Sequence, residues 1–261
     1  MTFMQHLEVL RKHLLRMAAA VFIASLVCFV SWDFLFNTLL FGPKDPDFAT
    51  YRAFCWLSEK TGIEAMCLES IPLELLNTQM SGQFSLHIWL SIMGGMVIAF
   101  PYIVYEIWRF IAPGLTDKER GASRFFILVV SGLFFLGAAF GYYLIVPLSV
   151  QFLANYTISP EIQNIIEVSS YLSMVASVSV ACGFLFELPV LIYFLVRMGL
   201  VTATFLRTYR RHALIILLIV AAVITPPDVM SQILVTLPLY ALFEVGILVA
   251  SWSEKNDKQH A

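Results

Sequence analysis

GFLFELPVL, residues 183–191, places one glutamate inside a run of apolar and aromatic residues, two positions before a proline. A carboxylate at the centre of a membrane helix costs roughly 2.5–3.5 kcal/mol on insertion scales, so Glu187 needs a physical reason. We interpret Glu187 as the end of a narrow strip of small and polar residues that includes Gly183, with larger apolar residues such as Phe184 on the opposite side. Such a strip is expected to face protein or a wet cavity instead of lipid.

Two interpretations of this acid stay open. Glu187 is either a neutral carboxyl group that hydrogen-bonds a neighbouring helix, or a site that meets a polar part of a substrate or partner. A second acid, Glu244 in YALFEVG (240–246), makes a structural bond between helices or a relay with Glu187. The relay would make the chain a proton- or ion-coupled small-solute transporter, although the matching acids of an inverted repeat are missing.

The composition identifies the surrounding medium. Hydrophobic residues make up 59% of the chain and charged residues only 13%, whereas soluble domains carry about 25% charged residues. We predict an all-α polytopic membrane protein with six transmembrane helices at about 14–38, 84–109, 124–147, 170–196, 212–225 and 232–252. The fifth stretch has only 14 residues, about 21 Å of helix against a hydrocarbon core of about 30 Å. We therefore expect the last two spans to be short and to form a hairpin that either thins the bilayer locally or fails to cross it fully.

The basic residues predict the orientation. All but three of the 16 Lys and Arg residues fall on one side of these spans. By the positive-inside rule, that side, which holds both chain ends and the loops near 110–124 and 197–212, is cytoplasmic. We expect residues 1–255 to form a single membrane domain, with an extended external loop at 42–83 and a short polar cytoplasmic tail at 254–261.

The four cysteines separate by this topology. Cys55 and Cys67 share the external loop, and in an oxidising compartment a disulfide between them would stabilise that loop by roughly 3 kcal/mol. The same loop is expected to hold a local helix near Tyr51–Ser58. Cys28 and Cys182 fall in apolar spans and are interpreted as small apolar packing residues.

YEIWRFIAPGLTDKER, residues 105–120, joins an aromatic interface belt to a Pro-Gly break and a helix start. Thr116 with Glu119 three residues later makes a capping box, which explains Glu119 as a structural residue. The same carboxylate suits recognition of a basic segment, because arginine pairs with carboxylates through two hydrogen bonds. Physical chemistry alone leaves both interpretations of Glu119 open.

Several classes of site are missing from the sequence. There is no HExxH zinc motif, and the five His residues are scattered without ligand spacing. Gly94 and Gly95 lie in a span, where helix packing explains them better than a phosphate loop. We therefore expect no metal, no cofactor and no nucleic-acid partner, with energy supplied by the membrane or by partners, and an intramembrane protease is poorly supported.

Four separate segments resemble the signature segments of the TatC family, the membrane receptor and core subunit of the twin-arginine protein translocase. They are HLEVLRKHLLR (6–16), EIWRFIAPGLTDKER (106–120), FLFELPV (184–190) and ITPPDVMSQ (224–232). The resemblance implies a six-helix, glove-shaped membrane protein of the bacterial cytoplasmic (inner) membrane. It also implies binding of twin-arginine signal peptides, and work with TatA-type and TatB-type single-span partners and further copies of itself. Folded proteins would be moved by the proton-motive force, and the protein would not be an enzyme.

The resemblance also assigns residues to signal-peptide binding: Glu119, Phe110 and Arg11 match the family's positions. The family motif commonly reads His-Leu-x-Glu-Leu-Arg, and this chain has Val9 in place of the glutamate. Glu8 is one residue away, which is about 100° around a helix. We therefore expect Glu119 to carry more of the arginine pairing, with Glu8 helping only where the N-terminal segment is flexible.

Deeper in the membrane, the resemblance assigns further positions. Glu187, with Pro189 beside it, matches the intramembrane acid on the family's concave face. Asp228 and Gln232 match the external end of the short hairpin near partner contacts. Pro43 resembles the proline that starts the first external loop.

Overall fold

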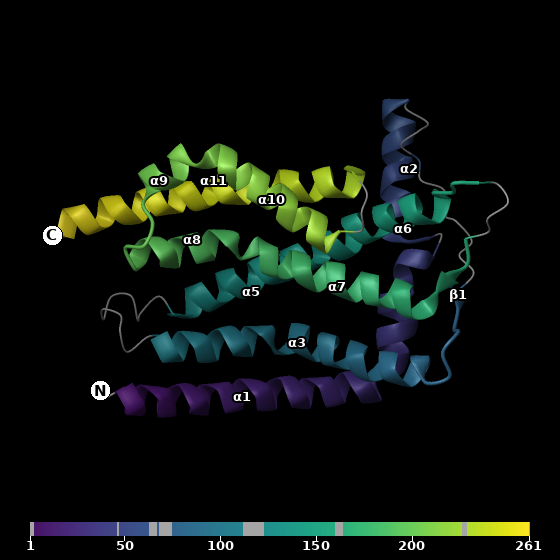
Figure 1. Ribbon diagram of the computed structural model, residues 1–261, viewed down its shortest axis with the longest axis horizontal. Coiled ribbons are helices and arrows are strands. Elements are labelled where there is room, and N and C mark those ends of the chain that lie inside the picture. Colours follow the sequence, from purple (N-terminus) through teal and green to yellow (C-terminus); the bar gives the residue numbers. More distant parts are fainter. Residues whose placement is uncertain are drawn as a thin grey trace. The chain divides into compact units, whose positions relative to one another are not determined.

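The computed structural model describes residues 3–45, 47–62, 67, 75–111, 123–159, 164–225 and 229–260, which are mostly helical (Figure 1). The helices are α1 (Phe3–Val30), η1 (Phe34–Leu40), η2 (Gly42–Lys44), α2 (Ala49–Thr61), α3 (Gly82–Ile111), α5 (Ser123–Phe140), η5 (Gly141–Ile145), α6 (Val146–Asn155), α7 (Val168–Phe186), α8 (Leu188–Arg197), α9 (Ala203–Thr208), α10 (Arg210–Ile224) and α11 (Val229–His260). Two short strands, β1 (Leu75–Leu76) and β2 (Ile166–Glu167), pair in parallel.

Several helical runs fit a bilayer. Among the described residues, five are long and apolar enough to cross one: Leu7–Val30, Gly82–Ile111, Phe125–Asn155, Val168–Arg197 and Ser231–Glu254. Large apolar side chains such as Phe22, Val30 and Val223 are exposed, as expected where lipid surrounds the helices instead of water. The prediction of an all-α polytopic membrane protein is confirmed.

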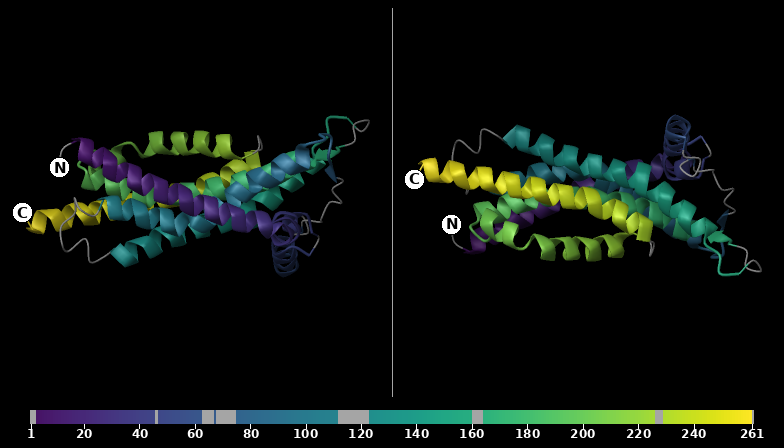
Figure 2. Two further views of the ribbon diagram at one scale, coloured as in Figure 1. Left: turned by 90° about the horizontal axis from the view of Figure 1, so that it is seen from below. Right: turned by 90° about the horizontal axis from the view of Figure 1, so that it is seen from above.

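The last two predicted spans differ from each other. α10 has 15 residues, about 22 Å of helix, and is as short as expected. α11 has 32 residues and appears as one long helix in Figure 2, so the prediction that the last span is short is wrong. Neither Gly nor Pro follows Trp252, and the helix therefore continues through the segment predicted as a polar tail. The sixth crossing and the cytoplasmic placement of both chain ends stay predictions.

Packing divides the chain into two compact units. Unit 1 comprises Met1–Gly42, Glu74–Leu133 and Ile165–Ala176. Unit 2 comprises Pro43–Leu73, Phe134–Asn164 and Ser177–Ala261.

In unit 1, α1 lies alongside α3 (Figure 1). Gly95 allows this close approach, because a Cβ atom at that position would lie only 2.7 Å from the Cα atom of Ser25 on α1. A Cβ atom on Gly94 would lie 3.0 Å from the Sγ atom of Cys28, which is buried. Small residues let two helix backbones approach closely in lipid. Gly94 and Gly95 are therefore packing residues, as predicted.

In unit 2, glycines bring α5 and α7 together. A Cβ atom on Gly137 would lie 2.7 Å from the Cβ atom of Phe186. On the other helix, a Cβ atom on Gly183 would lie 2.8 Å from the ring of Phe134. Cys182 is buried in the same contact and fits its interpretation as an apolar packing residue. α11 completes the unit by packing against α8, α9 and α10.

The span predicted as one helix at 170–196 is broken at Glu187, between α7 and α8. Pro189 lacks an amide N–H and so cannot bond the Leu185 carbonyl, as an unbroken helix would require. The Glu187 amide instead bonds the carbonyl three residues earlier at 3.1 Å, which is a 3₁₀-type step. Glu187 therefore sits in a break between two helices.

The loop predicted at 42–83 contains α2, which includes the local helix expected near Tyr51–Ser58. Cys55 and Cys67 are joined by a disulfide. α2 is seen lengthwise in Figure 1 and nearly end-on in Figure 2, whereas α11 lies lengthwise in both. Within unit 2, α2 therefore runs across the direction of α11, as suits a surface helix that does not span the membrane.

Candidate functional site

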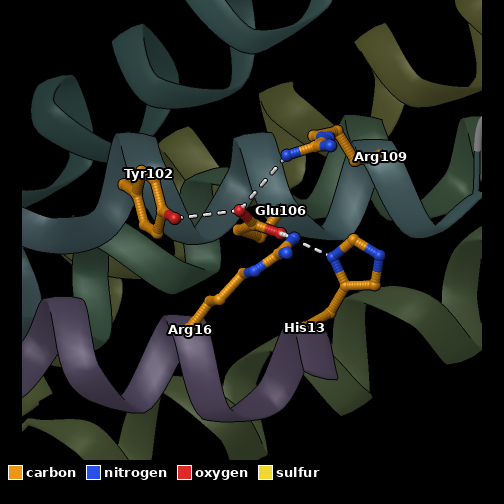
Figure 3. Close-up of polar contacts among 5 residues, drawn as sticks. All are labelled: His13, Arg16, Tyr102, Glu106 and Arg109. Atoms are coloured by element: carbon orange, nitrogen blue, oxygen red, sulfur yellow. Dashed lines mark hydrogen bonds and ion pairs between the residues drawn. The ribbon is translucent and has the colours of Figure 1, made fainter. Parts of the chain in front are cut away.

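Five side chains of α1 and α3 meet in unit 1 (Figure 3). The carboxyl group of Glu106 is at their centre, and only 1% of its side chain is exposed. Nδ1 of His13 lies 2.5 Å from one carboxyl oxygen, and Tyr102 donates a hydrogen bond of 2.9 Å to the other. Guanidinium nitrogens of Arg16 and Arg109 lie 3.9 and 3.7 Å from the carboxyl oxygens. We call these five residues the Glu106 cluster.

Helical spacing brings the Glu106 cluster together. Tyr102, Glu106 and Arg109 are four and three residues apart, so they share one face of α3. His13 and Arg16 are three residues apart on α1 and share a face in the same way. Removing a carboxylate from water is costly unless cations and donors surround it. The cluster supplies both from two helices, and it therefore ties the N-terminal half of α1 to the C-terminal part of α3.

Of the predicted signal-binding residues, Phe110 contacts the Glu106 cluster, and Arg11 and Glu8 lie on the same helix as His13. The ring of Phe110 contacts the ring of His13 edge to face, with centroids 5.9 Å apart. Arg11 and Glu8 are exposed on α1, and Glu8 forms an ion pair of 2.9 Å with the lysine four residues later. An exposed pair of this kind contributes little stability, so the Glu8 carboxylate can exchange it for another cation. Glu119 lies outside the described residues.

A second candidate site is a groove of about 680 Å³ in unit 2. Side chains from α7 to α11 line it and are mostly apolar, with Glu187, Tyr209 and His212 as polar members. Both carboxyl oxygens of Glu187 are buried, and neither has a hydrogen-bond partner among the described residues. Since a buried polar group without a partner is unfavourable, the groove holds an acid that the described part of the chain leaves unsatisfied.

The groove corrects the predicted surroundings of Glu187. Phe184 and Leu191 line the same groove as Glu187, and the predicted placement of Phe184 on the opposite side is wrong. Phe184, Glu187 and Leu191 are three and four residues apart, so they lie on the same side of the chain. That side borders the groove together with residues of α9 and α10 and is not a polar strip. Gly183 packs against α5, and Pro189 is buried at the start of α8.

Other predicted residues make contacts between helices. Glu244 of α11 accepts a hydrogen bond of 2.7 Å from Arg210 of α10, which matches the interpretation of Glu244 as a bond between helices and not as a relay. The Gln232 amide donates to the Leu218 carbonyl of α10 at 3.2 Å. Asp228 lies outside the described residues.

Pro43 takes part in anchoring α2. It is buried in η2, and its carbonyl accepts a hydrogen bond of 2.9 Å from the Tyr51 hydroxyl. Burial raises the pKa of Tyr51 to about 12, so the hydroxyl keeps its proton and remains a donor at physiological pH. Phe48, just before α2, stacks on Tyr143 of η5 with ring centroids 5.4 Å apart.

Sequence reasoning missed the Glu106 cluster. The 93 residues that separate His13 from Glu106 hide the contact, which exists only once α1 and α3 pair. One signal was nonetheless present: Tyr102, Glu106 and Arg109 recur at helical spacing near the end of an apolar stretch. Polar groups on one face of a membrane helix indicate a neighbour that satisfies them.

These features define a class of protein. It is a multi-pass helical membrane protein with a charged cluster where two helices pair and an apolar groove that encloses an unsatisfied acid. Within the described residues, no group of three or more His, Cys, Asp or Glu could hold a metal ion. Both sites consist of polar groups beside or within apolar surfaces of helices.

Comparisons with known proteins identify the family. The family model described as Sec-independent protein translocase protein (TatC) matches residues 5–238. The TatC protein of Blattabacterium sp. subsp. Periplaneta americana (strain BPLAN) is 39% identical over 257 residues, 98% of this chain and 97% of that protein. The TatC protein of Helicobacter pylori (strain ATCC 700392 / 26695) is 35% identical over 245 residues, 94% of this chain and 85% of that protein.

Solved structures agree with this result. A crystal structure of the twin-arginine translocase receptor TatC in DDM has a TM-score of 0.74 and 29% sequence identity, covering 94% of this chain and 99% of that one. A second crystal structure of the same receptor has a TM-score of 0.69 and 28% identity, with 95% and 99% coverage. The chain belongs to the TatC family of protein translocase proteins.

Proposed function

We propose that this protein is the signal-peptide receptor and core subunit of a twin-arginine translocase in a bacterial cytoplasmic (inner) membrane. It binds the signal peptides of folded cargo proteins and moves them, driven by the proton-motive force, with TatA-type and TatB-type partners and further copies of itself. The observation that carries the proposal is the TatC match along nearly the whole chain. A translocase of this kind performs no covalent chemistry, in keeping with sites made of contacts and charges.

The recognition step is proposed for the cytoplasmic end of α3 and the loop that follows it. Glu119 pairs with the arginines of the signal, because a carboxylate accepts two parallel hydrogen bonds from a guanidinium. Phe110 of α3 offers an aromatic face to the same signal, and the exposed Glu8 and Arg11 of α1 complete the surface. Support comes from the contact of Phe110 with the Glu106 cluster, which holds the aromatic ring in place.

The unit 2 groove is proposed as a contact site for a partner helix. Its walls are apolar, and the buried carboxyl group of Glu187 lacks a hydrogen-bond partner in the described part of the chain. A polar side chain on an otherwise apolar partner helix would satisfy that group. The short α10 beside the groove lowers the cost of access from the lipid side.

The small-solute transporter with a relay from Glu187 to Glu244 is the weaker alternative. Glu244 is neutralised by Arg210 at 2.7 Å, which does not suit a residue that exchanges protons. The family match also favours protein translocation.

Photocrosslinking tests the recognition step. A photoreactive amino acid at position 110 should crosslink a synthetic signal peptide with two arginines, and Glu119→Lys should abolish that crosslink by repelling the arginines. The matched control carries the same group at position 84, a phenylalanine at the opposite end of α3 that is 64% exposed. Crosslinking of equal strength from position 84, or an unchanged crosslink in Glu119→Lys, would contradict the proposal.

A further inference from the structure

The Glu106 cluster holds more basic than acidic groups. The guanidinium groups of Arg16 and Arg109 and the imidazole of His13 face a single carboxylate. The two arginine side chains are 52% and 49% exposed, whereas Glu106 is 1% exposed. The arginines therefore present positive charge at the surface, and the carboxylate influences that surface through its electric field instead of through contact.

The cluster borders the surface proposed to receive the signal peptide. Phe110 follows Arg109 in the chain and packs against His13, and Arg11 precedes Arg16 on α1. A peptide with two consecutive arginines that approaches this surface meets positive charges of the protein itself. Like charges at short range oppose binding, so the surface requires a compensating negative charge.

We propose that Glu106 is a positioning residue for the recognition of twin-arginine signals: its carboxylate offsets part of the positive charge of Arg16 and Arg109 beside Phe110 and so permits a dicationic peptide to dock. Glu106 does not touch the peptide. It acts through the two arginines and through His13, whose ring it positions against Phe110. This inference rests on the proposed function, because it concerns the same recognition surface.

A purely structural role for Glu106 makes a different prediction. If the carboxylate only tied α1 to α3, each further substitution in the cluster would lower the affinity for the peptide more. Ionic strength would then have little influence on the effect of Glu106→Gln. If the carboxylate cancels charge, removal of an arginine compensates for its loss, and salt screens the effect. The two roles are therefore separable by a double variant and by a salt series.

The experiment uses the full-length protein in lipid nanodiscs and a synthetic signal peptide with two arginines. Affinity is measured at about 50 mM and at about 1 M salt, because the screening length falls to about 3 Å at the higher concentration. Glu106→Gln should weaken binding about tenfold at low salt and little at high salt. The double variant Glu106→Gln with Arg109→Gln should recover most of that loss. Asp33→Asn removes one negative charge from an exposed acid outside the cluster, and it should bind like the wild type.

If Glu106→Gln fails to fold, the variant Arg109→Gln tests the same inference. Arg109→Gln removes an exposed positive charge and leaves Glu106 in place, so it should tighten binding about threefold at low salt. The inference is overturned if Glu106→Gln binds like the wild type, if the double variant binds more weakly than the single one, or if Arg109→Gln weakens binding. Wild-type protein that ignores the peptide altogether would contradict the proposed function and this inference with it.

Discussion

Glu106, within α3, and Glu187, in the break between α7 and α8, are both acids in apolar segments, but their surroundings differ. Glu106 has a tyrosine hydroxyl, a histidine and two arginines within 4 Å of its carboxyl oxygens, so its burial is compensated inside the protein. Glu187 has no hydrogen-bond partner among the described residues. Glu106 therefore ties α1 to α3 within unit 1, while Glu187 is the acid that we propose as a contact for a partner helix.

Substitution of Glu187 tests this difference. Glu187→Ala should weaken partner binding about tenfold, because one hydrogen bond between helices in a membrane contributes about 1–2 kcal/mol. Glu187→Gln should lose less, since an amide still bonds a polar side chain. The measurement is the affinity of detergent-solubilised protein for a single-span partner, together with export in cells. Asp33→Asn, at an exposed acid that accepts a hydrogen bond from Asn37 at 2.6 Å, is the control. Normal export and affinity in Glu187→Ala would contradict the proposed role of the groove.

At the level of single residues, the sequence pointed to Glu187 and not to Glu106 for a physical reason. Glu187 stands in the middle of an apolar run, where an insertion cost makes any acid conspicuous. Glu106 lies beside an aromatic interface belt, where charged residues are ordinary. Its burial depends on α1, 93 residues earlier in the chain, and no local pattern reports such pairing.

The helical elements followed their hydropathy with two exceptions. Apolar stretches predicted where helices lie, because a backbone in lipid must bond itself and the helix does so within one segment. The break at Glu187 was not predicted, although Pro189 provides the cause. The length of α11 was underestimated because hydropathy falls at the charged residues after Trp252, whereas helix propensity does not.

The contact between α1 and α3 allows a sharp test at this scale. Gly95→Ala should lower the free energy of unfolding of the purified protein by about 1–3 kcal/mol, and so lower its melting temperature, because the added methyl group would overlap the backbone of Ser25 and force the helices apart. Gly132→Ala is the matched control, since a Cβ atom there has nothing within 4 Å. Thermal unfolding in detergent measures both. Equal melting temperatures for the two variants would show that the close approach of α1 and α3 is unimportant.

On the scale of the whole molecule, composition and charge distribution predicted a polytopic membrane protein. The segments that resemble the TatC family indicated its function. The relation between distant segments was out of reach, because it depends on which helix faces pair in lipid. Gly94 and Gly95 suggested packing but not the partner helix. The two candidate sites therefore had to be located by the structure, one on α1 and α3 and one around α7 to α11.

The central claim is that the protein captures a positively charged export tag by charge and shape, without any covalent step. The most direct measurement compares the affinity of full-length protein in nanodiscs for a signal peptide with two arginines and for the same peptide with two lysines. Because only arginine pairs with a carboxylate through two parallel hydrogen bonds, we expect about tenfold tighter binding of the arginine peptide. Equal affinity for the two peptides would contradict the account.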